Sequence, residues 1–215
     1  MFSNTLGNII DVEYEPIYKA VLEKIYKDYE QNVKYFNKAM NIKGINVYFP
    51  LTAPKVCDKD MIFWHITGFE SQEINKLNMH VCSGDEKSYV KCKELCNENC
   101  RSRQRKYKIN NGKTKHFCIY RAKRVVWIPK IIQLYNSGDS RVKAWYNYQN
   151  DKQGKNKRFQ FYIRFIEGLT DYIVIFEAIK KENIITQYKF ITAFPVFFID
   201  EKDRFDDSFK NQINL

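Results

Sequence analysis

Apolar and polar residues follow two different periods along this chain, and the period changes near its middle. In residues 15–40, large apolar side chains recur at steps of three and four, the period of an amphipathic helix. These positions are Tyr18, Leu22, Ile25, Tyr29, Val33, Phe36 and Met40. Pro16 suits the first helical turn, where a missing N–H costs no helical hydrogen bond. We therefore expect residues 15–40 to form one long helix that covers a sheet.

The second half of the chain is typical of β-strands joined by short polar links. Strand-like runs cover residues 141–149, 157–166, 172–179 and 184–194, with turn-rich stretches such as "NDKQGKN" between them. Short links of this kind favour an antiparallel meander. The predicted fold class is therefore α+β: N-terminal helices packed on a four-stranded antiparallel β-meander, with a Cys-rich insertion.

Side chains alternate between the two faces of a strand, so each run also predicts which residues lie together. In "KRFQFYIRFIE", one face carries Phe159, Phe161, Ile163 and Phe165, and the other carries Arg158, Gln160, Tyr162 and Arg164. The second face suits phosphate and base contacts, although a solvated sheet face gives the same pattern. In the last run, strict alternation places Tyr188, Phe190, Thr192 and Phe194 on one face.

Three shorter segments precede the meander. "INVYFPLT" indicates a strand that ends at Pro50, and "MIFWHIT" is a strand or a buried helical turn, since so short an apolar run fits both. "RAKRVVWIPKIIQLYNSGD" predicts two helical pieces interrupted by Pro129, because proline clashes with the preceding turn of a helix.

The chain is long enough for one substantial domain. We expect a single domain over residues 1–215, with an N-terminal helical scaffold (1–56), a core (57–200) that contains a polar insertion (70–118), and a C-terminal tail (201–215). No run approaches the roughly 18 apolar residues of a membrane helix, and the first residues lack the pattern of a signal peptide. We expect a cytoplasmic protein without a membrane partner.

The formal net charge is +11, which favours a polyanion such as nucleic acid as partner. The chain is also rich in Lys, Asn, Ile and Tyr, which an AT-rich genome produces without selection for binding. Charge alone therefore leaves nucleic-acid binding and compositional bias open.

Six cysteines raise the possibility of a metal site, because disulfides are uncommon without secretion. In "CKELCNENC", Cys92, Cys96 and Cys100 are four residues apart, and the candidates for a fourth ligand are Cys82, Cys118, His80 and His116. One unbroken helix cannot bring all three thiolates to one zinc ion, but a helix that ends at "NEN" can. Structural zinc and reduced thiols are the alternatives.

An ordered set of short motifs carries the functional signal. "FWHIT" is followed by "RAKRVVWIPKII", then by the meander, and finally by "FITAF". This order resembles bacterial and phage nucleases of the barnase/EndoU/colicin-D/RelE-like superfamily, over about residues 60–197 without the insertion. Each motif is short, so the order is more specific than any single element.

The resemblance implies a set of functional residues. It places catalytic residues at His65, Arg124 and Thr192, with Arg164 as a softer match. The predicted nucleic-acid contacts are Thr67 of "FWHIT", Arg121 from its helical spacing to Arg124, and Arg158 and Tyr162 from the polar face of their strand. These residue types suit RNA cleavage without a metal, which needs a proton acceptor for the 2′-hydroxyl and cations beside the phosphate. His65, alone in an apolar run, also fits a structural core histidine, and Arg121 with Arg124 also fits a solvated helix face.

The expected function is a metal-independent endoribonuclease that cleaves RNA by 2′-hydroxyl attack and needs no cofactor for catalysis. By the resemblance it is a toxin or anti-phage effector, with RNA and a protein inhibitor or antitoxin as partners. The alternative is a non-catalytic nucleic-acid-binding or partner-neutralising protein of phage or plasmid origin. A close approach of His65, Arg124, Arg164 and Thr192 in a cleft favours the enzyme.

Overall fold

The structure of the chain is a computed structural model. It describes residues 6, 18–34, 40–50, 55, 58–70, 106–108, 114–150, 154, 156–196 and 198–213, and only the backbone at 18–21, 69–70, 106–108, 114–116 and 119.

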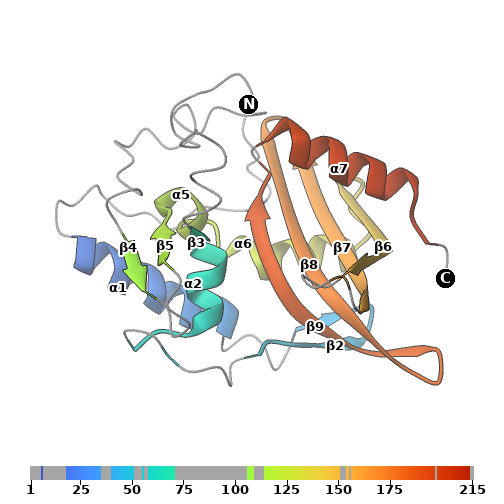
Figure 1. Cartoon of the computed structure of the whole chain (residues 1–215), viewed down its shortest axis with the longest axis horizontal. Helices are drawn as coiled ribbons and strands as arrows, with labels where there is room; N and C mark the ends of the chain where they lie inside the picture. The colour runs from blue at the N-terminus through green and yellow to red at the C-terminus, as the bar shows by residue number, and fades with distance from the viewer. Residues whose placement is uncertain are drawn as a thin grey trace.

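The chain begins with helices and ends with a sheet and one further helix (Figure 1). The elements that precede the meander are α1 (Tyr18–Tyr29), the π-helical turn η1 (Glu30–Lys34), β1 (Asn41–Ile42), β2 (Ile45–Tyr48), α2 (Met61–Thr67), β3 (Gly68–Glu70), β4 (Lys106–Lys108), β5 (Thr114–Phe117), α5 (Ile119–Ala122) and α6 (Trp127–Asn136). Then follow β6 (Val142–Asn150), β7 (Lys157–Glu167), β8 (Thr170–Lys181), β9 (Ile184–Pro195) and α7 (Ile199–Lys210).

The α+β class is confirmed, and the sheet is larger than expected. Strands β6 to β9 pair antiparallel in chain order, as a meander does. The sheet nevertheless has six strands, in the order β1-β2-β9-β8-β7-β6, because the N-terminal hairpin joins its edge. Since β2 runs parallel to β9, the sheet is mixed and the expectation of a purely antiparallel four-stranded sheet is wrong in that detail.

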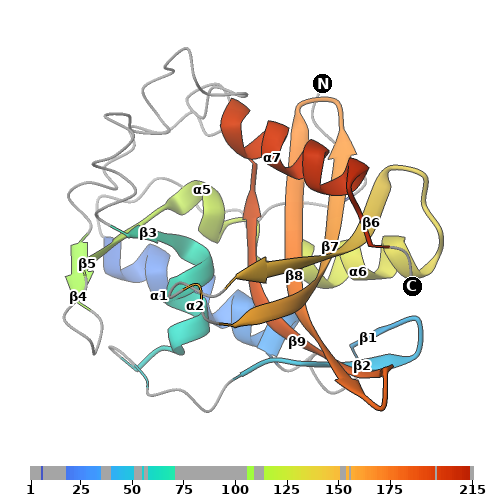
Figure 2. The same ribbon diagram turned by 45° about the vertical axis from the view of Figure 1, so that its right-hand side comes forward.

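Helices cover both faces of this sheet, as Figures 1 and 2 show. Helix α6 packs on one face through Ile128, Ile131 and Ile132, in the large core that also takes side chains of α1 and α2. Helix α7 crosses the opposite face and buries Phe205 there, in a smaller apolar cluster with Trp145 and Tyr162. We call these the core face and the α7 face.

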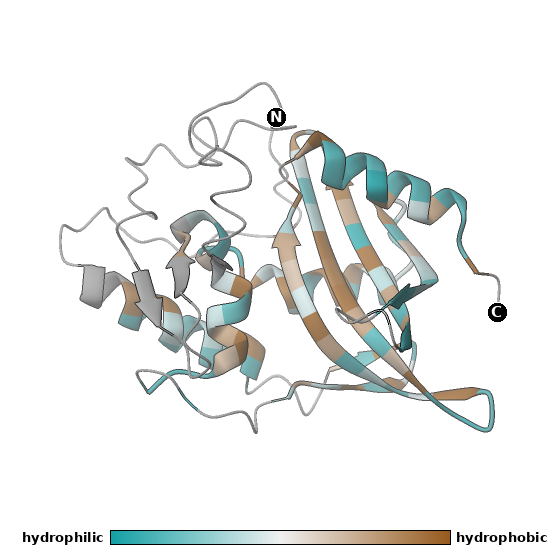
Figure 3. Ribbon diagram, viewed as in Figure 1, coloured by the Kyte–Doolittle hydropathy of each residue, from teal (hydrophilic) through white to brown (hydrophobic). Residues whose placement is uncertain are grey.

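The alternation predicted for β7 is confirmed, and it is visible as bands along the strands in Figure 3. Phe159, Phe161, Ile163 and Phe165 all belong to the core cluster, whereas Tyr162 belongs to the cluster under α7.

Strand β9 departs from strict alternation, so the expected shared face of its aromatic residues and Thr192 is wrong. Ile175 pairs with Thr192 and Phe176 pairs with Phe190, which leaves Ile191 as an extra residue in a β-bulge. A bulge shifts all later side chains to the opposite face. Tyr188 and Phe190 therefore lie in the core, whereas Phe194 lies on the α7 face.

The structure also gives the secondary structure of the short segments before the meander. Residues 61–67 form a helix, and the amphipathic segment from residue 15 is helical from Tyr18 to Lys34 within the described residues. The break between α5 and α6 lies at 123–126, and Pro129 is the third residue of α6. Proline is tolerated there because first-turn N–H groups have no helical acceptor.

Two regions contain secondary structure that we did not predict from the sequence. Residues at both ends of the expected insertion pair as a small sheet in the order β3-β5-β4, and the expected tail forms most of α7. None of the helices in the described part of the chain has the length and apolar character needed to cross a membrane.

Candidate functional site

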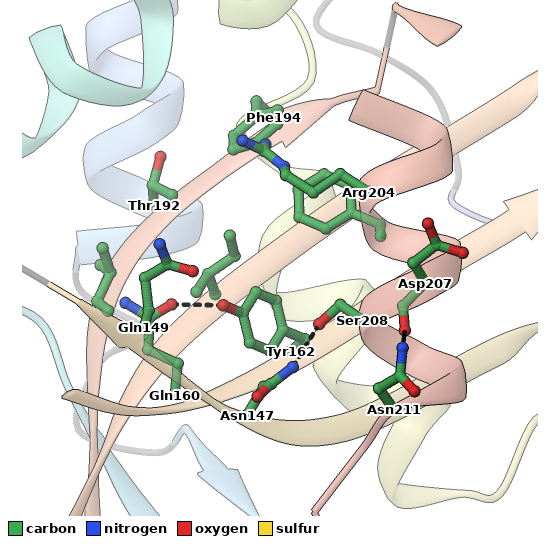
Figure 4. A pocket seen from close by; sticks show the side chains of 13 residues that line it. Asn147, Gln149, Gln160, Tyr162, Thr192, Phe194, Arg204, Asp207, Ser208 and Asn211 are labelled. Atoms are coloured by element: carbon green, nitrogen blue, oxygen red, sulfur yellow. Dashed lines mark hydrogen bonds between the residues drawn. The ribbon is translucent and has the colours of Figure 1, made fainter. Parts of the chain in front are cut away.

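A hollow of about 650 Å³ lies between the α7 face of the sheet and α7 itself (Figure 4). This volume is within the range of small-ligand sites. The lining from the strands is Asn147, Gln149, Gln160, Tyr162, Ile175, Ile191, Thr192 and Phe194. Helix α7 adds Arg204, Phe205, Asp207 and Ser208, and Asn211 follows directly after the helix. The lining therefore combines apolar and aromatic walls with amides, hydroxyls and one guanidinium group.

The bulge in β9 determines what this hollow contains. Because Ile191 is the extra residue, both Ile191 and Thr192 line the hollow, while Phe190 and Ala193 on either side are buried in the core. Bulges often redirect side chains at functional sites. Of the residues predicted from the sequence, Thr192 and Tyr162 lie in the lining.

Arg121 connects the hollow to helix α2. Its guanidinium carbon lies 5.4 Å from the ring centroid of Phe194, which lines the hollow, and its Nη1 donates to the carbonyl of Gly68 at 3.1 Å. Gly68 directly follows α2, and α2 packs against both α5 and β9. The elements that carry His65, Arg121 and Thr192 therefore meet at one edge of the large sheet.

Arg124 lies one turn beyond Arg121 and is buried. Its guanidinium carbon is 3.4 Å from the ring centroid of Tyr120, and its Nη1 donates to the Tyr120 carbonyl. Arg124 Nε and the nearby indole N–H of Trp127 are both buried without a hydrogen-bond acceptor among the described residues. Buried donors usually have an acceptor, so these two N–H groups are candidates to bind an acceptor oxygen.

Tyr172 lies beside these two arginines. Burial raises the pKa of Tyr172, and the positive charges of Arg121 and Arg124 oppose that shift. The tyrosine is therefore neutral at physiological pH, and both guanidinium groups lie close to the start of β8.

His65 is exposed on α2, whereas its neighbours Trp64 and Ile66 are buried. The alternative of a buried core histidine is therefore excluded, and the imidazole can meet a ligand that arrives from solvent. Thr67 is different, because it is fully buried and its hydroxyl donates to the carbonyl of Phe63 within the same helix at 2.8 Å. This contact gives Thr67 a structural role in α2 and leaves no room for the predicted contact to nucleic acid.

Arg164 lies on the α7 face but is committed to two carboxylates. Its Nε and Nη2 donate to Asp171 at 2.8 and 2.6 Å, and its Nη1 donates to Asp206 of α7 at 2.8 Å. Its side chain is only 1% exposed. A phosphate would have to displace a carboxylate to reach this guanidinium. These contacts indicate that Arg164 links α7 to the sheet, and they do not favour the catalytic role expected from the sequence.

Lys202 completes this network. It donates to Asp206 at 2.8 Å. Although partial burial opposes the shift, this hydrogen bond and the charge of Arg164 hold the pKa of Asp206 below its ordinary value. Arg158, the remaining predicted contact, is exposed near the start of β7.

The expected zinc ligands Cys82, Cys92, Cys96 and Cys100 lie outside the described residues. Within the described part of the chain, no three His, Cys, Asp or Glu side chains gather as a metal site would require. Cys118 is buried there.

Sequence reasoning missed the wall that α7 contributes, including Arg204 and Ser208. Phe205 and Phe209 are four residues apart, which is a helical signal, but acidic and basic residues surround them. Comparisons with known protein families, with curated proteins and with solved structures find no match to this chain.

Proposed function

We propose that this protein is a metal-independent endoribonuclease whose substrate enters the hollow on the α7 face. The observation that carries the proposal is the position of Arg121, which contacts both the end of α2 and the Phe194 wall of the hollow. A single-stranded RNA bound in the hollow would thus pass close to the helix that carries His65. The net charge of +11 favours RNA as the polyanion.

The proposed chemistry assigns one role to each group. His65 takes the proton of a ribose 2′-hydroxyl, the resulting oxygen attacks the adjacent phosphorus, the bond to the 5′-oxygen breaks, and the departing 5′-oxygen takes a proton from water. Arg124 stabilises the charge that grows on the phosphate, and the Thr192 hydroxyl donates to a phosphate oxygen. The products are a 2′,3′-cyclic phosphate and a free 5′-hydroxyl, and no oxidant or metal is required.

The site that we propose leaves out Arg164 and Thr67, because their side chains already hydrogen-bond within the protein. The remaining cations beside the hollow are Arg204 in its lining and Arg121 at its Phe194 wall. In the biological role that the sequence favours, a toxin or defence effector, such a site would act on cellular or phage RNA.

A non-catalytic RNA-binding protein is the second candidate. It is favoured by the composition of the hollow, because the described residues that line it include no histidine and, as ionisable groups, only Tyr162, Arg204 and Asp207. Under this alternative the hollow holds a nucleotide and His65 is a solvent-exposed surface residue.

Incubation of the pure protein with single-stranded RNA, with and without a chelator, separates these functions. The enzyme cuts RNA equally in both and leaves cyclic phosphate ends, and His65→Ala loses about 10²–10⁴-fold in rate, the usual worth of a positioned acid or base. Retention of intact RNA in both conditions would show a binding protein. Cleavage that His65→Ala leaves unchanged would exclude His65 from the site.

A further inference from the structure

The hollow contains an amide whose orientation is held by a neighbouring tyrosine. The Tyr162 hydroxyl donates to Gln160 Oε1 at 2.6 Å, and the dashed line between them in Figure 4 marks this contact. The Tyr162 ring stacks on Trp145 at 5.0 Å with an interplanar angle of 5°. Burial raises the pKa of Tyr162, so its hydroxyl remains a donor at neutral pH. This contact holds Oε1 toward Tyr162, so the Nε2 amide hydrogens of Gln160 are donors that the hollow offers to a ligand.

Ser208, on the opposite wall, is also arranged as a donor. Its Oγ accepts from the indole N–H of Trp145 at 2.8 Å and from Asn147 Nδ2 at 3.1 Å. These two bonds occupy the lone pairs of the hydroxyl and leave its hydrogen for a ligand. The side-chain oxygen of Asn147, Oδ1, in turn accepts a hydrogen bond from the backbone N–H of Tyr148. Both walls therefore present hydrogen-bond donors, and Arg204 adds another from α7.

The rest of the lining suits a flat ring. Ile175, Ile191 and Phe194 provide apolar and aromatic surface between the donors. An unstacked nucleobase has this shape, and single-stranded RNA is usually recognised through such bases. Uracil and guanine carry a carbonyl oxygen where cytosine and adenine carry an amino group, so only the first pair offers an acceptor at that position.

We infer that the hollow selects keto nucleobases, with Gln160 as the specificity-determining residue and Tyr162 as the residue that positions its amide. This inference rests on the proposed function, since it takes RNA as the ligand. A cytosine or adenine in the same pose points its amino group at the Gln160 amide hydrogens. Two donors then face each other without an acceptor, which weakens binding.

The test uses oligonucleotides that differ only in this group. Short 2′-O-methyl oligouridine and oligocytidine lack the attacking hydroxyl and so report binding without cleavage, and inosine and adenosine oligomers form a second matched pair. Fluorescence anisotropy should show tighter binding of the keto member in each pair, by about tenfold, as for one well-placed base contact. Equal affinity, or tighter binding of the amino member, would overturn the inference.

Two variants examine the mechanism of selection. Gln160→Glu keeps the shape of the side chain but replaces donors with an acceptor, so the preference should turn from uridine to cytidine. Tyr162→Phe frees the Gln160 amide to rotate, so the uridine-to-cytidine ratio should fall toward one in a protein that unfolds at nearly the parent temperature. Gln187→Glu, an exposed residue on β9, makes the same charge change outside the hollow and should leave the ratio unchanged. A uridine preference that survives both hollow variants would show that Gln160 does not determine specificity.

The outcomes separate this inference from the proposed function. Cleavage of RNA in chelator with no keto preference would overturn the inference and leave the endoribonuclease. A keto preference without cleavage would support the inference and indicate the binding protein.

Discussion

The two faces of the large sheet are built from the same strands but differ in what they bury. The core face packs Phe161, Phe176 and Phe190 into one large cluster of aliphatic and aromatic side chains. The α7 face buries Arg164 and Gln160 beside Trp145 and Tyr162, and it retains the hollow. Alternation thus lets one face stabilise the fold while the other holds polar groups in fixed positions. The difference predicts that substitutions on the core face change stability and that substitutions in the hollow change RNA recognition.

The largest stability effect should come from the core face. Phe176 is fully buried, so Phe176→Ala should lower the free energy of unfolding by about 3–5 kcal/mol, through lost burial and a new cavity. Ile179→Ala on the same strand is partly exposed and should cost much less. Urea unfolding followed by circular dichroism measures both. Similar losses for the two variants would contradict the assignment of the core.

A substitution of Arg164 tests whether its buried ion pair with Asp171 stabilises the fold on the α7 face. Arg164→Met leaves Asp171 buried without its partner, and breaking one side of such a pair costs about 3–5 kcal/mol. Arg158→Met removes the same charge from an exposed position and should change stability by less than about 0.5 kcal/mol. If Arg164→Met instead keeps full stability and loses only RNA cleavage, Arg164 belongs to the active site and our interpretation of its contacts is wrong.

Arg204 tests the contribution of α7 to RNA binding. Arg204→Gln removes a cation from the hollow, so RNA affinity should fall and the slope of log K against log salt should decrease by about one. Lys210→Gln changes the same charge on the same helix, at a residue that is not in the lining. Equal effects of the two variants in salt titrations would indicate that only the net charge of α7 matters.

The smallest effect should come from the turn between α6 and β6, away from both faces. Hydrogen bonds from Arg141 lower the pKa of Asp139 from 3.8 to about 2. The ionised carboxylate therefore stabilises the fold above about pH 4, and this stabilisation is lost as the pH falls through about 2. The stability difference between the parent and Asp139→Asn should be constant above pH 4 and shrink below it. A difference that persists unchanged to pH 2 would rule out this origin.

The sequence predicted the parts of this molecule that depend on local pattern. The meander, the two faces of β7 and the helical character of residues near Tyr18 follow from periodicity, whereas the assignment of Thr192 and Tyr162 to a functional site stays a prediction. The bulge at Ile191 has no periodic signal, since one extra residue reverses a face without altering composition.

The partners of Arg164 were harder to foresee. Asp206 is 42 residues away in sequence, on a helix that the polar C-terminal segment did not predict. The contact with Asp171 could be predicted from the sequence. The turn pairs Glu167 with Thr170, and this register places Asp171 diagonally across from Arg164. The antiparallel pairing of β7 with β8 is therefore enough to predict the ion pair between Arg164 and Asp171.

RNA cleavage by two matched threonine variants tests the central claim that the hollow on the α7 face is the functional site. Thr192→Val removes a hydroxyl from the hollow with almost no change in shape, and Thr186→Val makes the same change at an exposed position on the same strand. We predict that Thr192→Val lowers the cleavage rate by up to about tenfold, the worth of one hydrogen bond, at nearly unchanged stability, and that Thr186→Val matches the parent. Equal rates for the parent and both variants would contradict the claim.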